Sequence, residues 1–306
     1  MMSTFDILGL GVVAVDDLVY VEAYPSPNAK VRVLDRERQC GGLTATALVA
    51  AARLGVRCAF GGTLGNDDLS QYAIQTLRRE GIDLTFLQQT ETARPAYSTI
   101  IIDESRQTRN IFVDLRQAVG VADDWPPVEV IQRCRALFVD HIGIVGAIRA
   151  ARLARRMGIP VVADIESDSQ QCSELVELVD HLILSQEFAC QYTGLTDPAQ
   201  LVNRFWRPDR STVVITCGGA GCWYRTNGDD FDQAASHFPA FSVKVVDTTG
   251  CGDVFHGAYT AALVKGLTGL ERIRFASAAA ALKATRRGGQ AGAPRLAALE
   301  EFLNRK

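Results

Sequence analysis

One glycine-bearing turn organises this chain, and it reads Val245-Val246-Asp247-Thr248-Thr249-Gly250-Cys251-Gly252-Asp253-Val254-Phe255-His256-Gly257. Before the turn, the β-branched residues Val243, Val245 and Val246 predict a buried strand. After it, residues 258–267 are rich in helix formers and predict a helix. The glycines are therefore expected in a turn that opens a helix.

The turn combines a backbone suited to anions with a carboxylate. Gly250 and Gly252 lack a Cβ, and the first N–H groups of a helix are unpaired donors that attract phosphate. Asp253 stands at the same helix start, where it can take a proton from a hydroxyl that attacks a phosphoryl group. The backbone at Gly250, Cys251 and Gly252 would stabilise the charge on that group. The alternative is that Asp253 caps the helix and the glycines are ordinary turn residues.

The composition favours a globular protein with one large core, because 47% of the 306 residues are hydrophobic and the formal net charge is only -3. Arg155-Arg156 and Arg286-Arg287 are too short to form a nucleic-acid stripe, and no segment resembles a signal peptide or a spanning helix. We therefore expect neither a nucleic-acid nor a membrane partner. The eight cysteines form no Cys-x-x-Cys pair, which predicts reduced thiols in a cytoplasmic protein. Cys251, at a helix N-terminus, is expected to be an oxidation-sensitive thiol of low pKa.

Short apolar runs alternate with helical patterns along most of the chain, as parallel strands joined by crossover helices require. The fold expected is a doubly wound, three-layer α/β/α sandwich. Four strand candidates illustrate the pattern: residues 136–139, 160–164, 181–184 and 212–216.

Two segments break this rhythm. Residues 18–38 and 94–114 alternate in polarity and carry turn-forming groups, which predicts strands outside the main sheet. Such strands suit a small lid that excludes water from a site. We expect a core of residues 1–11, 39–92 and 117–306, and a lid of residues 12–38 and 93–116.

The main rival is a dinucleotide fold, because Gly9-Leu10-Gly11-Val12-Val13-Ala14 satisfies its glycine fingerprint and Asp35 follows at about the required spacing. That fingerprint needs a helix after the glycines, whereas residues 12–21 are mostly β-branched or aromatic. We therefore predict a first core strand over residues 9–15 that continues into the lid and that Asp16 ends.

The turn at 247–253 closely resembles the Asp-Thr-x-Gly-Ala-Gly-Asp signature of the PfkB (ribokinase-like) carbohydrate kinases, with Cys251 in place of alanine. The segment Gly41-Gly42-Leu43-Thr44-Ala45-Thr46-Ala47, followed by Ala52-Arg53-Leu54-Gly55, is similar to the first motif of that family. Residues 61–68 look like its Gly-x-x-Gly-x-Asp turn, which we interpret as structural, with an aspartate that caps a helix. The resemblance implies an ATP-dependent sugar kinase with a β lid over the sugar.

On the sugar side, the resemblance is nearest to ketohexokinase and fructokinase and, over residues 283–292, to sulfofructose kinases, so a ketose is favoured. It implies substrate contacts for seven residues: Asp16, Lys30, Gly41, Gly42, Thr46, Arg109 and Asp253. Lys30 and Arg109 are equally plausible as solvated hairpin residues. Ribokinase-like and nucleoside kinase activities stay open, as does a sensor that binds without turnover.

On the nucleotide side, Thr216-Cys217-Gly218-Gly219-Ala220-Gly221 is similar to the family segment near the ATP phosphates, and residues 279–292 to the segment that packs on adenine. The nucleotide contacts implied are Gln186, Thr216, Gly218, Gly221, Thr249, Gly252 and Ala281. Gln186 and Ala189 stand where relatives carry Asn-x-x-Glu, so Glu187 is the candidate carboxylate near Mg²⁺.

The resemblance also implies a potassium site, mostly of backbone oxygens. Its implied residues are Asp247, Thr249, Lys283, Arg286, Gly288 and Gly292. A lid sheet with an apolar face is commonly buried by a second copy, so we expect a homodimer.

Overall fold

The computed structural model describes residues 5–106, 108–167, 169–227 and 235–305. Its central sheet has the strand order β14-β13-β12-β11-β10-β9-β1-β4. The strands from β12 to β4 are parallel, and β13 and β14 continue the sheet in antiparallel pairing. Their bounds are β1 (Ile7–Leu10), β4 (Cys58–Phe60), β9 (Ala136–Asp140), β10 (Val161–Asp164), β11 (His181–Ser185), β12 (Thr212–Thr216), β13 (Cys222–Thr226) and β14 (Ser236–Phe238). The four predicted strands are thereby confirmed.

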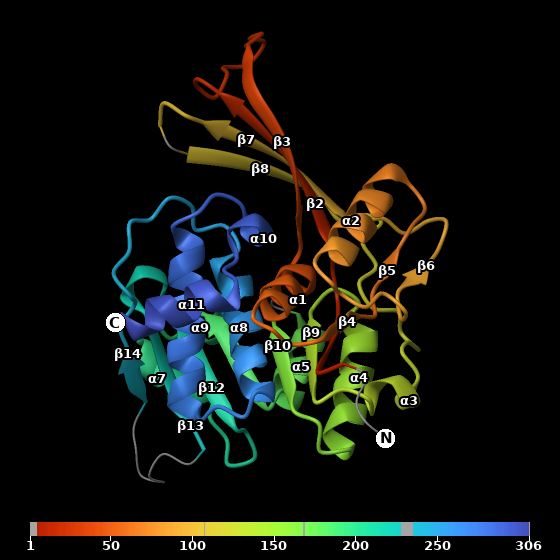
Figure 1. Cartoon of the computed structure of the whole chain (residues 1–306), viewed down its shortest axis with the longest axis vertical. Helices are drawn as coiled ribbons and strands as arrows, with labels where there is room; N and C mark the ends of the chain where they lie inside the picture. Colours follow the sequence, from red (N-terminus) through yellow and green to blue (C-terminus); the bar gives the residue numbers. More distant parts are fainter. Residues whose placement is uncertain (1–4, 107, 168, 228–234, 306) are drawn as a thin grey trace.

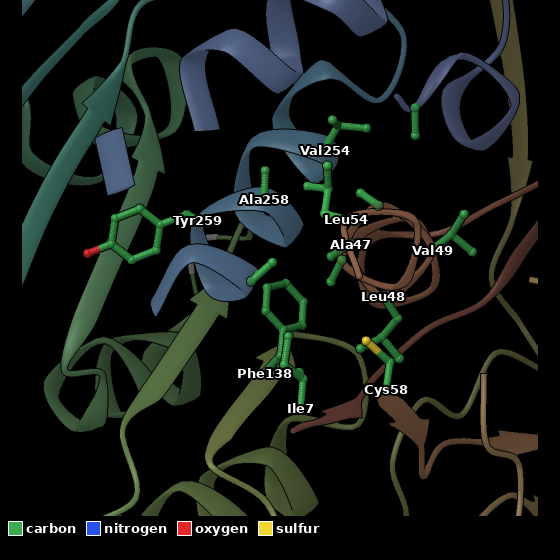
Figure 2. Close-up of a cluster of buried hydrophobic side chains, with 14 of the residues drawn as sticks. Ile7, Ala47, Leu48, Val49, Leu54, Cys58, Phe138, Val254, Ala258 and Tyr259 are labelled. Carbon is green, nitrogen blue, oxygen red and sulfur yellow. The ribbon is translucent and has the colours of Figure 1, made fainter. Parts of the chain in front are cut away.

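Alternate side chains of these strands enter two separate cores, one on each face of the sheet. Ile7 and Phe138 belong to the first core, whereas Leu8 and Leu137 belong to the second. Figure 2 shows the first core, where Leu48, Val254 and Ala258 pack over Ile7 and Phe138. Two cores around one sheet make the three-layer α/β/α sandwich predicted from the sequence.

Helices cover both faces of the sheet. The first core is covered by α1 (Leu43–Arg53), α2 (Asp68–Arg79), α8 (Cys251–Val264), α9 (Gly269–Ala284) and α11 (Leu296–Asn304). The second is covered by α3 (Val128–Ile131), α4 (Ile144–Arg156), α5 (Gln170–Leu178), α6 (Gln186–Thr193) and α7 (Pro198–Phe205). Two short elements, η1 (Gly218–Ala220) and α10 (Gly289–Gly292), lie in connecting loops.

A separate four-stranded sheet stands at one end of the core, at the top of Figure 1. We call it the lid sheet. It has the order β3-β2-β7-β8, with β2 and β7 parallel and the other pairs antiparallel. Its strands are β2 (Ala14–Val21), β3 (Val33–Gly41), β7 (Ala96–Asp103) and β8 (Thr108–Asp114). A third sheet pairs only β5 (Thr63–Leu64) with β6 (Gln88–Gln89).

The single strand predicted over residues 9–15 is wrong. Two strands, β1 and β2, lie there instead, and Asp16 lies inside β2 rather than at a strand end. The chain leaves the main sheet after Leu10, where Asp140 of β9 accepts hydrogen bonds from Val12 N (2.7 Å) and Thr44 Oγ1 (2.7 Å). Because β2 follows the glycines directly, no helix opens there and the dinucleotide alternative is excluded.

The buried strand predicted at Val243, Val245 and Val246 is also wrong. Residues 241–246 form no strand, and Val245 and Val246 are 59% and 52% exposed. Val246 N and Asp247 N both donate to the Ala284 carbonyl (2.7 and 3.1 Å), so this extended segment is bound to the end of α9 and not to a sheet. By contrast, the helix cap predicted in the turn at residues 61–68 is confirmed, since the Asp67 side chain accepts from Leu69 N and Ser70 N at the start of α2.

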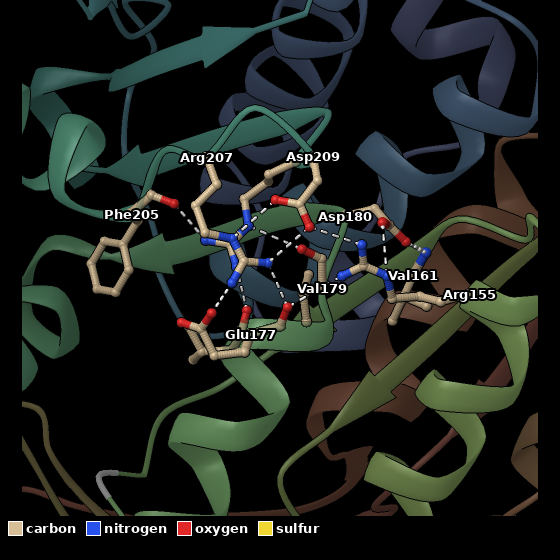
Figure 3. A network of polar contacts seen from close by, with 10 residues as sticks. Arg155, Val161, Glu177, Val179, Asp180, Phe205, Arg207 and Asp209 are labelled. Atoms are coloured by element: carbon tan, nitrogen blue, oxygen red, sulfur yellow. Dashed lines mark hydrogen bonds and ion pairs between the residues drawn. The ribbon is translucent and has the colours of Figure 1, made fainter.

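A polar network far from the lid sheet holds the other end of the core together (Figure 3). Asp180 accepts from Val161 N (3.0 Å) and faces Arg155 (3.6 Å). Arg210, only 1% exposed, donates to the carbonyls of Val179 (3.0 Å), Phe205 and Val176. Burial lowers the pKa of Arg210 to about 10, which leaves it charged at neutral pH. These contacts join α5 and α7 to the start of β11.

No helix among the described residues is long and apolar enough to cross a membrane.

Candidate active site

The predicted turn lies at the N-terminus of α8, with Gly250 as the N-cap residue. Gly250 has φ 72°, a left-handed conformation that favours glycine, and an added Cβ would lie 2.9 Å from Gly289 Cα. Of the predicted anion donors, Cys251 N already donates to the Thr248 carbonyl (3.2 Å). The N–H groups that suit an anion at this helix start are therefore those of Gly250, Gly252 and Asp253.

Asp253 lies half-buried in the first turn of α8. Burial, followed by the negative charges of Asp164 and Glu166, raises its pKa well above the ordinary value. Asp164 ends β10, is itself buried, and lies 3.3 Å from His256 Nδ1 one helical turn beyond Asp253. A carboxylate with a raised pKa at the floor of a site is suited to accept a proton from a bound hydroxyl.

A pocket of about 580 Å³ separates the lid sheet from the start of α8. Asp253 and Gly250 line its core side, together with the loops around Asp247 and Gly288. The lid sheet contributes one face, since paired residues of β2, β7 and β8 alternate into the pocket. Those lid residues are Asp16, Leu18, Tyr20, Ile100, Ile102, Arg109 and Ile111.

Six of the seven predicted sugar-side residues line this pocket: Asp16, Gly41, Gly42, Thr46, Arg109 and Asp253. Lys30 does not line it, because it is exposed in the loop between β2 and β3. Charge near a turn does not say where a side chain points, so the contact of Lys30 with substrate stays a prediction.

Asp16 and Gly41 form one wall of the pocket. Asp16 is partly buried, which raises its pKa, although a hydrogen bond with Ser98 acts in the opposite direction. An added Cβ on Gly41 would lie 2.8 Å from Asp16 Oδ2, so only glycine leaves this carboxylate in place. Gly42 has φ 94° and an added Cβ would lie 2.6 Å from Ala14 N, which explains glycine at the N-cap of α1.

Arg109 crosses the pocket from the lid sheet to the core. Its Nη1 donates to Thr249 Oγ1 (2.6 Å) and lies 4.0 Å from Asp247 Oδ1. A guanidinium with 45% side-chain exposure retains donors for a ligand while it touches the anion turn. The structure thus places a cation of the lid directly above the proposed anion site.

Four of the predicted nucleotide residues lie at the carboxyl ends of β11 and β12. Gln186 begins α6 directly after β11, and Thr216 ends β12 beside it, with Ser185 paired to Thr216. Gly218 and Gly221 flank the short turn η1, and Ala281 lies in α9. Of this predicted set, Thr249 lines the pocket and Gly252 lies between two of its lining residues, whereas the other five lie outside it. Ligands of open α/β sheets bind at this edge.

The loop predicted to hold a monovalent cation contains a buried ammonium group instead. Lys283 is fully buried, and its Nζ lies 2.7 Å from the Asp247 carbonyl and 3.4 Å from the Arg286 carbonyl. Asp247 Oδ2 lies 3.5 Å from the same Nζ and accepts from Gly288 N (2.8 Å). Thr249 N donates to the other carboxylate oxygen (2.9 Å), so Asp247 joins the two loops. A potassium ion does not fit among these oxygens while the ammonium group is present.

One further sequence prediction changes, and two residues of the pocket were not predicted. Burial raises the pKa of the Cys251 thiol, so the prediction of a low-pKa, oxidation-sensitive cysteine is wrong. The sequence analysis also missed Gln39 and Arg287, which line the pocket from β3 and from the loop after α9. No motif marks Gln39, and Arg287 lies within the family-like segment 279–292 but had no predicted role; tertiary packing brings both side chains to the pocket.

Metal ligands of the protein itself are sparse. Among the residues that the structure describes, no three His, Cys, Asp or Glu side chains group together to hold a metal ion. Glu187 is exposed in the first turn of α6, whereas Ala189, two residues later in the same helix, is buried.

A family model supplies the decisive comparison. The model of the pfkB family carbohydrate kinases matches residues 10–296 of this chain. The chain belongs to this family. It is therefore a sugar kinase, a phosphotransferase with an alcohol group as acceptor.

Individual relatives of this pfkB family kinase agree with that assignment. A ribokinase of Haemophilus influenzae is 25% identical over 309 residues, covering 96% of this chain and 97% of its own. Fructokinase-1 of Zea mays is 28% identical over 295 residues, covering 87% and 88%. The solved structure of an Arabidopsis thaliana ribokinase with ribose and ATP has a TM-score of 0.85 at 22% identity and covers 99% of both chains, which shows the shared fold.

Proposed function

We propose that this chain transfers the γ-phosphoryl group of ATP to a hydroxyl of a ketose sugar. One observation carries the proposal: Asp253, with its raised pKa, shares one pocket with the anion-binding start of α8 and with the polar wall formed by Asp16 and Gly41. This arrangement supports deprotonation of a hydroxyl beside a phosphate-binding backbone.

In the proposed reaction, Asp253 accepts the proton of the sugar hydroxyl as its oxygen attacks the γ-phosphorus in line. The N–H groups of Gly250, Gly252 and Asp253 stabilise the charge that develops on the transferred phosphoryl oxygens, and ADP leaves toward the carboxyl ends of β11 and β12. Arg109 adds positive charge from the lid side. The lid sheet excludes water, which would otherwise compete with the sugar.

ATP is the proposed donor because one solved relative is described in complex with ribose and ATP. Thr216, Gly218 and Gly221 would border its phosphates, and Ala281 its base, while Gln186 lies at the adjacent strand end. Mg²⁺ would neutralise the phosphates and be held mainly by them and by water, because Glu187, the carboxylate predicted near it, is an exposed side chain on α6.

The preference for a ketose is supported by the similarity to a plant fructokinase and by the ketohexokinase-like positions of Asp16 and Arg109. Asp16 is placed to accept hydrogen bonds from sugar hydroxyls at the pocket wall. Ribokinase activity is the second candidate, because the ribokinase relative covers almost the whole chain.

The test is sugar-dependent release of ADP from Mg-ATP over ketoses, aldoses, sulfonated and acidic sugars, and nucleosides. We expect the highest kcat/KM with a ketose. A tenfold preference for ribose or a nucleoside would replace the ketose assignment. Binding of both ligands without any ADP release would indicate a sensor instead of an enzyme.

We also propose that the chain forms a homodimer through the lid sheet and that it works in the cytoplasm. Leu34, Phe112 and Val113 of its strands are all at least half exposed, which favours burial by a second copy. Light scattering at micromolar concentration tests the assembly, and a strict monomer would contradict it. All eight cysteines are free thiols, as a reducing compartment allows.

A further inference from the structure

The ammonium group of Lys283 lies among oxygens that converge from two separate loops. The Asp247 carbonyl comes from the segment before α8, and the Arg286 carbonyl comes from the loop after α9. The Asp247 carboxylate completes the set at 3.5 Å. Three acceptors around one buried cation match the three donors of a lysine ammonium group.

The methylene stem of Lys283 packs against α10. An added Cβ on Gly292 would lie 3.1 Å from Lys283 Cε, so α10 packs directly on the side chain. Lys283 is 0% exposed, and a buried ammonium group without partners is strongly unfavourable. The negative charge of Asp247 offsets the free-energy cost of burying the Lys283 ammonium group.

The loops that Lys283 joins are the ones that shape the anion site. Val246 N and Asp247 N bind the Ala284 carbonyl, and Gly250 approaches Gly289 closely. Asp247 also receives Gly288 N and Thr249 N. Displacement of the ammonium group would therefore move the N–H groups at the start of α8.

We infer that Lys283 is a built-in replacement for a monovalent cation, and that this kinase holds its anion site in place without potassium. An ammonium ion and a potassium ion have similar sizes, and carbonyl oxygens can surround either one. An ammonium group that belongs to a side chain, however, cannot dissociate from the protein. Lys283 is a positioning residue, since it contacts the loops and neither sugar nor phosphate. The inference rests on the proposed kinase reaction only for its kinetic test.

The first experiment measures turnover in tetramethylammonium buffer and adds KCl at constant ionic strength. The wild-type rate is expected to change less than twofold. Lys283→Met, which keeps the stem and removes the charge, is expected to lose about a hundredfold in kcat, as small misplacements of reacting groups do. The matched control is Lys265→Met, an exposed lysine just after α8, which is expected to be unaffected. Potassium activation of the wild-type enzyme would overturn the inference.

The second experiment needs no catalysis and separates this inference from the proposed function. Lys283→Ala opens the space among the same oxygens, so KCl is expected to raise its Tm relative to tetramethylammonium chloride of equal ionic strength. The wild-type Tm is expected to show no such potassium-specific rise. A potassium-specific rise in the wild type, or its absence in a folded Lys283→Ala variant, would overturn the inference. If neither variant folds, the potassium response of the wild-type Tm and rate still decides the question.

Discussion

Arg109 of the lid sheet donates a 2.6 Å hydrogen bond to Thr249 Oγ1, two residues beyond Asp247 and one before the N-cap of α8. This bond closes the pocket with a cation at the place where the transferred phosphoryl group is expected. We predict that Arg109→Gln lowers the kcat/KM of the sugar about tenfold, which corresponds to about 1.4 kcal/mol, the scale of one hydrogen bond to a charged group.

Steady-state kinetics with both substrates varied checks this prediction. Arg106→Gln is the control, because it lies exposed in the turn of the same hairpin. Equal effects of the two substitutions would mean that only the overall charge of the lid matters.

The raised pKa of Asp253 gives a prediction about stability. Burial and the charges of Asp164 and Glu166 raise this pKa, so the folded protein favours the neutral carboxyl group. The charged form therefore weakens the fold as pH rises through the folded-state pKa, and the penalty is absent below the unfolded value. Asp253→Asn should raise Tm at pH 8 and lose this advantage as pH falls. Calorimetry between pH 5 and pH 8 measures it, and a lower Tm of the variant throughout would contradict the prediction.

The raised pKa of Asp253 also predicts how kcat/KM changes at low pH. The base must be ionised, so kcat/KM should fall as pH falls through a pKa above the usual carboxyl range. A flat profile down to the ordinary pKa of a carboxyl group would show that Asp253 is not the titrating base.

Gly41→Ala should act on the sugar and not on ATP. The new methyl group would lie 2.8 Å from Asp16 Oδ2 and push this carboxylate from the pocket wall. We expect the KM of the sugar to rise at least about tenfold, as loss of a good polar contact does, with the KM of ATP unchanged. An effect confined to the KM of ATP would place Asp16 and Gly41 in the wrong half of the site.

Arg210 gives a prediction outside the site. Its guanidinium is buried and donates to three backbone carbonyls, which Arg210→Met would leave without these donors. We expect the free energy of unfolding to fall by at least about 2 kcal/mol. Urea unfolding measures it, with the exposed Arg204→Met on α7 as the control. Equal stabilities of the two variants would contradict the role given to the network.

The sequence predicted the layers of this fold well because its apolar runs are short and its helices carry clear ends. The strand predicted at 212–216 appears as β12, and the helix predicted after the glycine turn appears as α8. The extended segment at 243–246 misled the prediction, because β-branched residues suit any extended backbone and say nothing about a neighbouring strand. Its partner is the end of α9, a contact between distant parts of the chain.

The site was predictable where backbone geometry fixes it, and less so where long side chains decide. Gly250 and Asp253 follow from the turn that opens α8. Lys283 appeared in the sequence as one of several loop residues around a cation, whereas in the structure its own ammonium group lies there. The direction of a long side chain depends on the tertiary packing around it, here on α10.

The central claim is that Asp253 is the base of a sugar kinase reaction. The most direct measurement is sugar-dependent ADP release by the wild-type enzyme and by Asp253→Asn, together with thermal shifts that show both proteins still bind ATP and sugar. The account predicts turnover by the wild type, and a loss of at least about a hundredfold in kcat in the variant with binding retained. Near wild-type turnover in Asp253→Asn would contradict the claim.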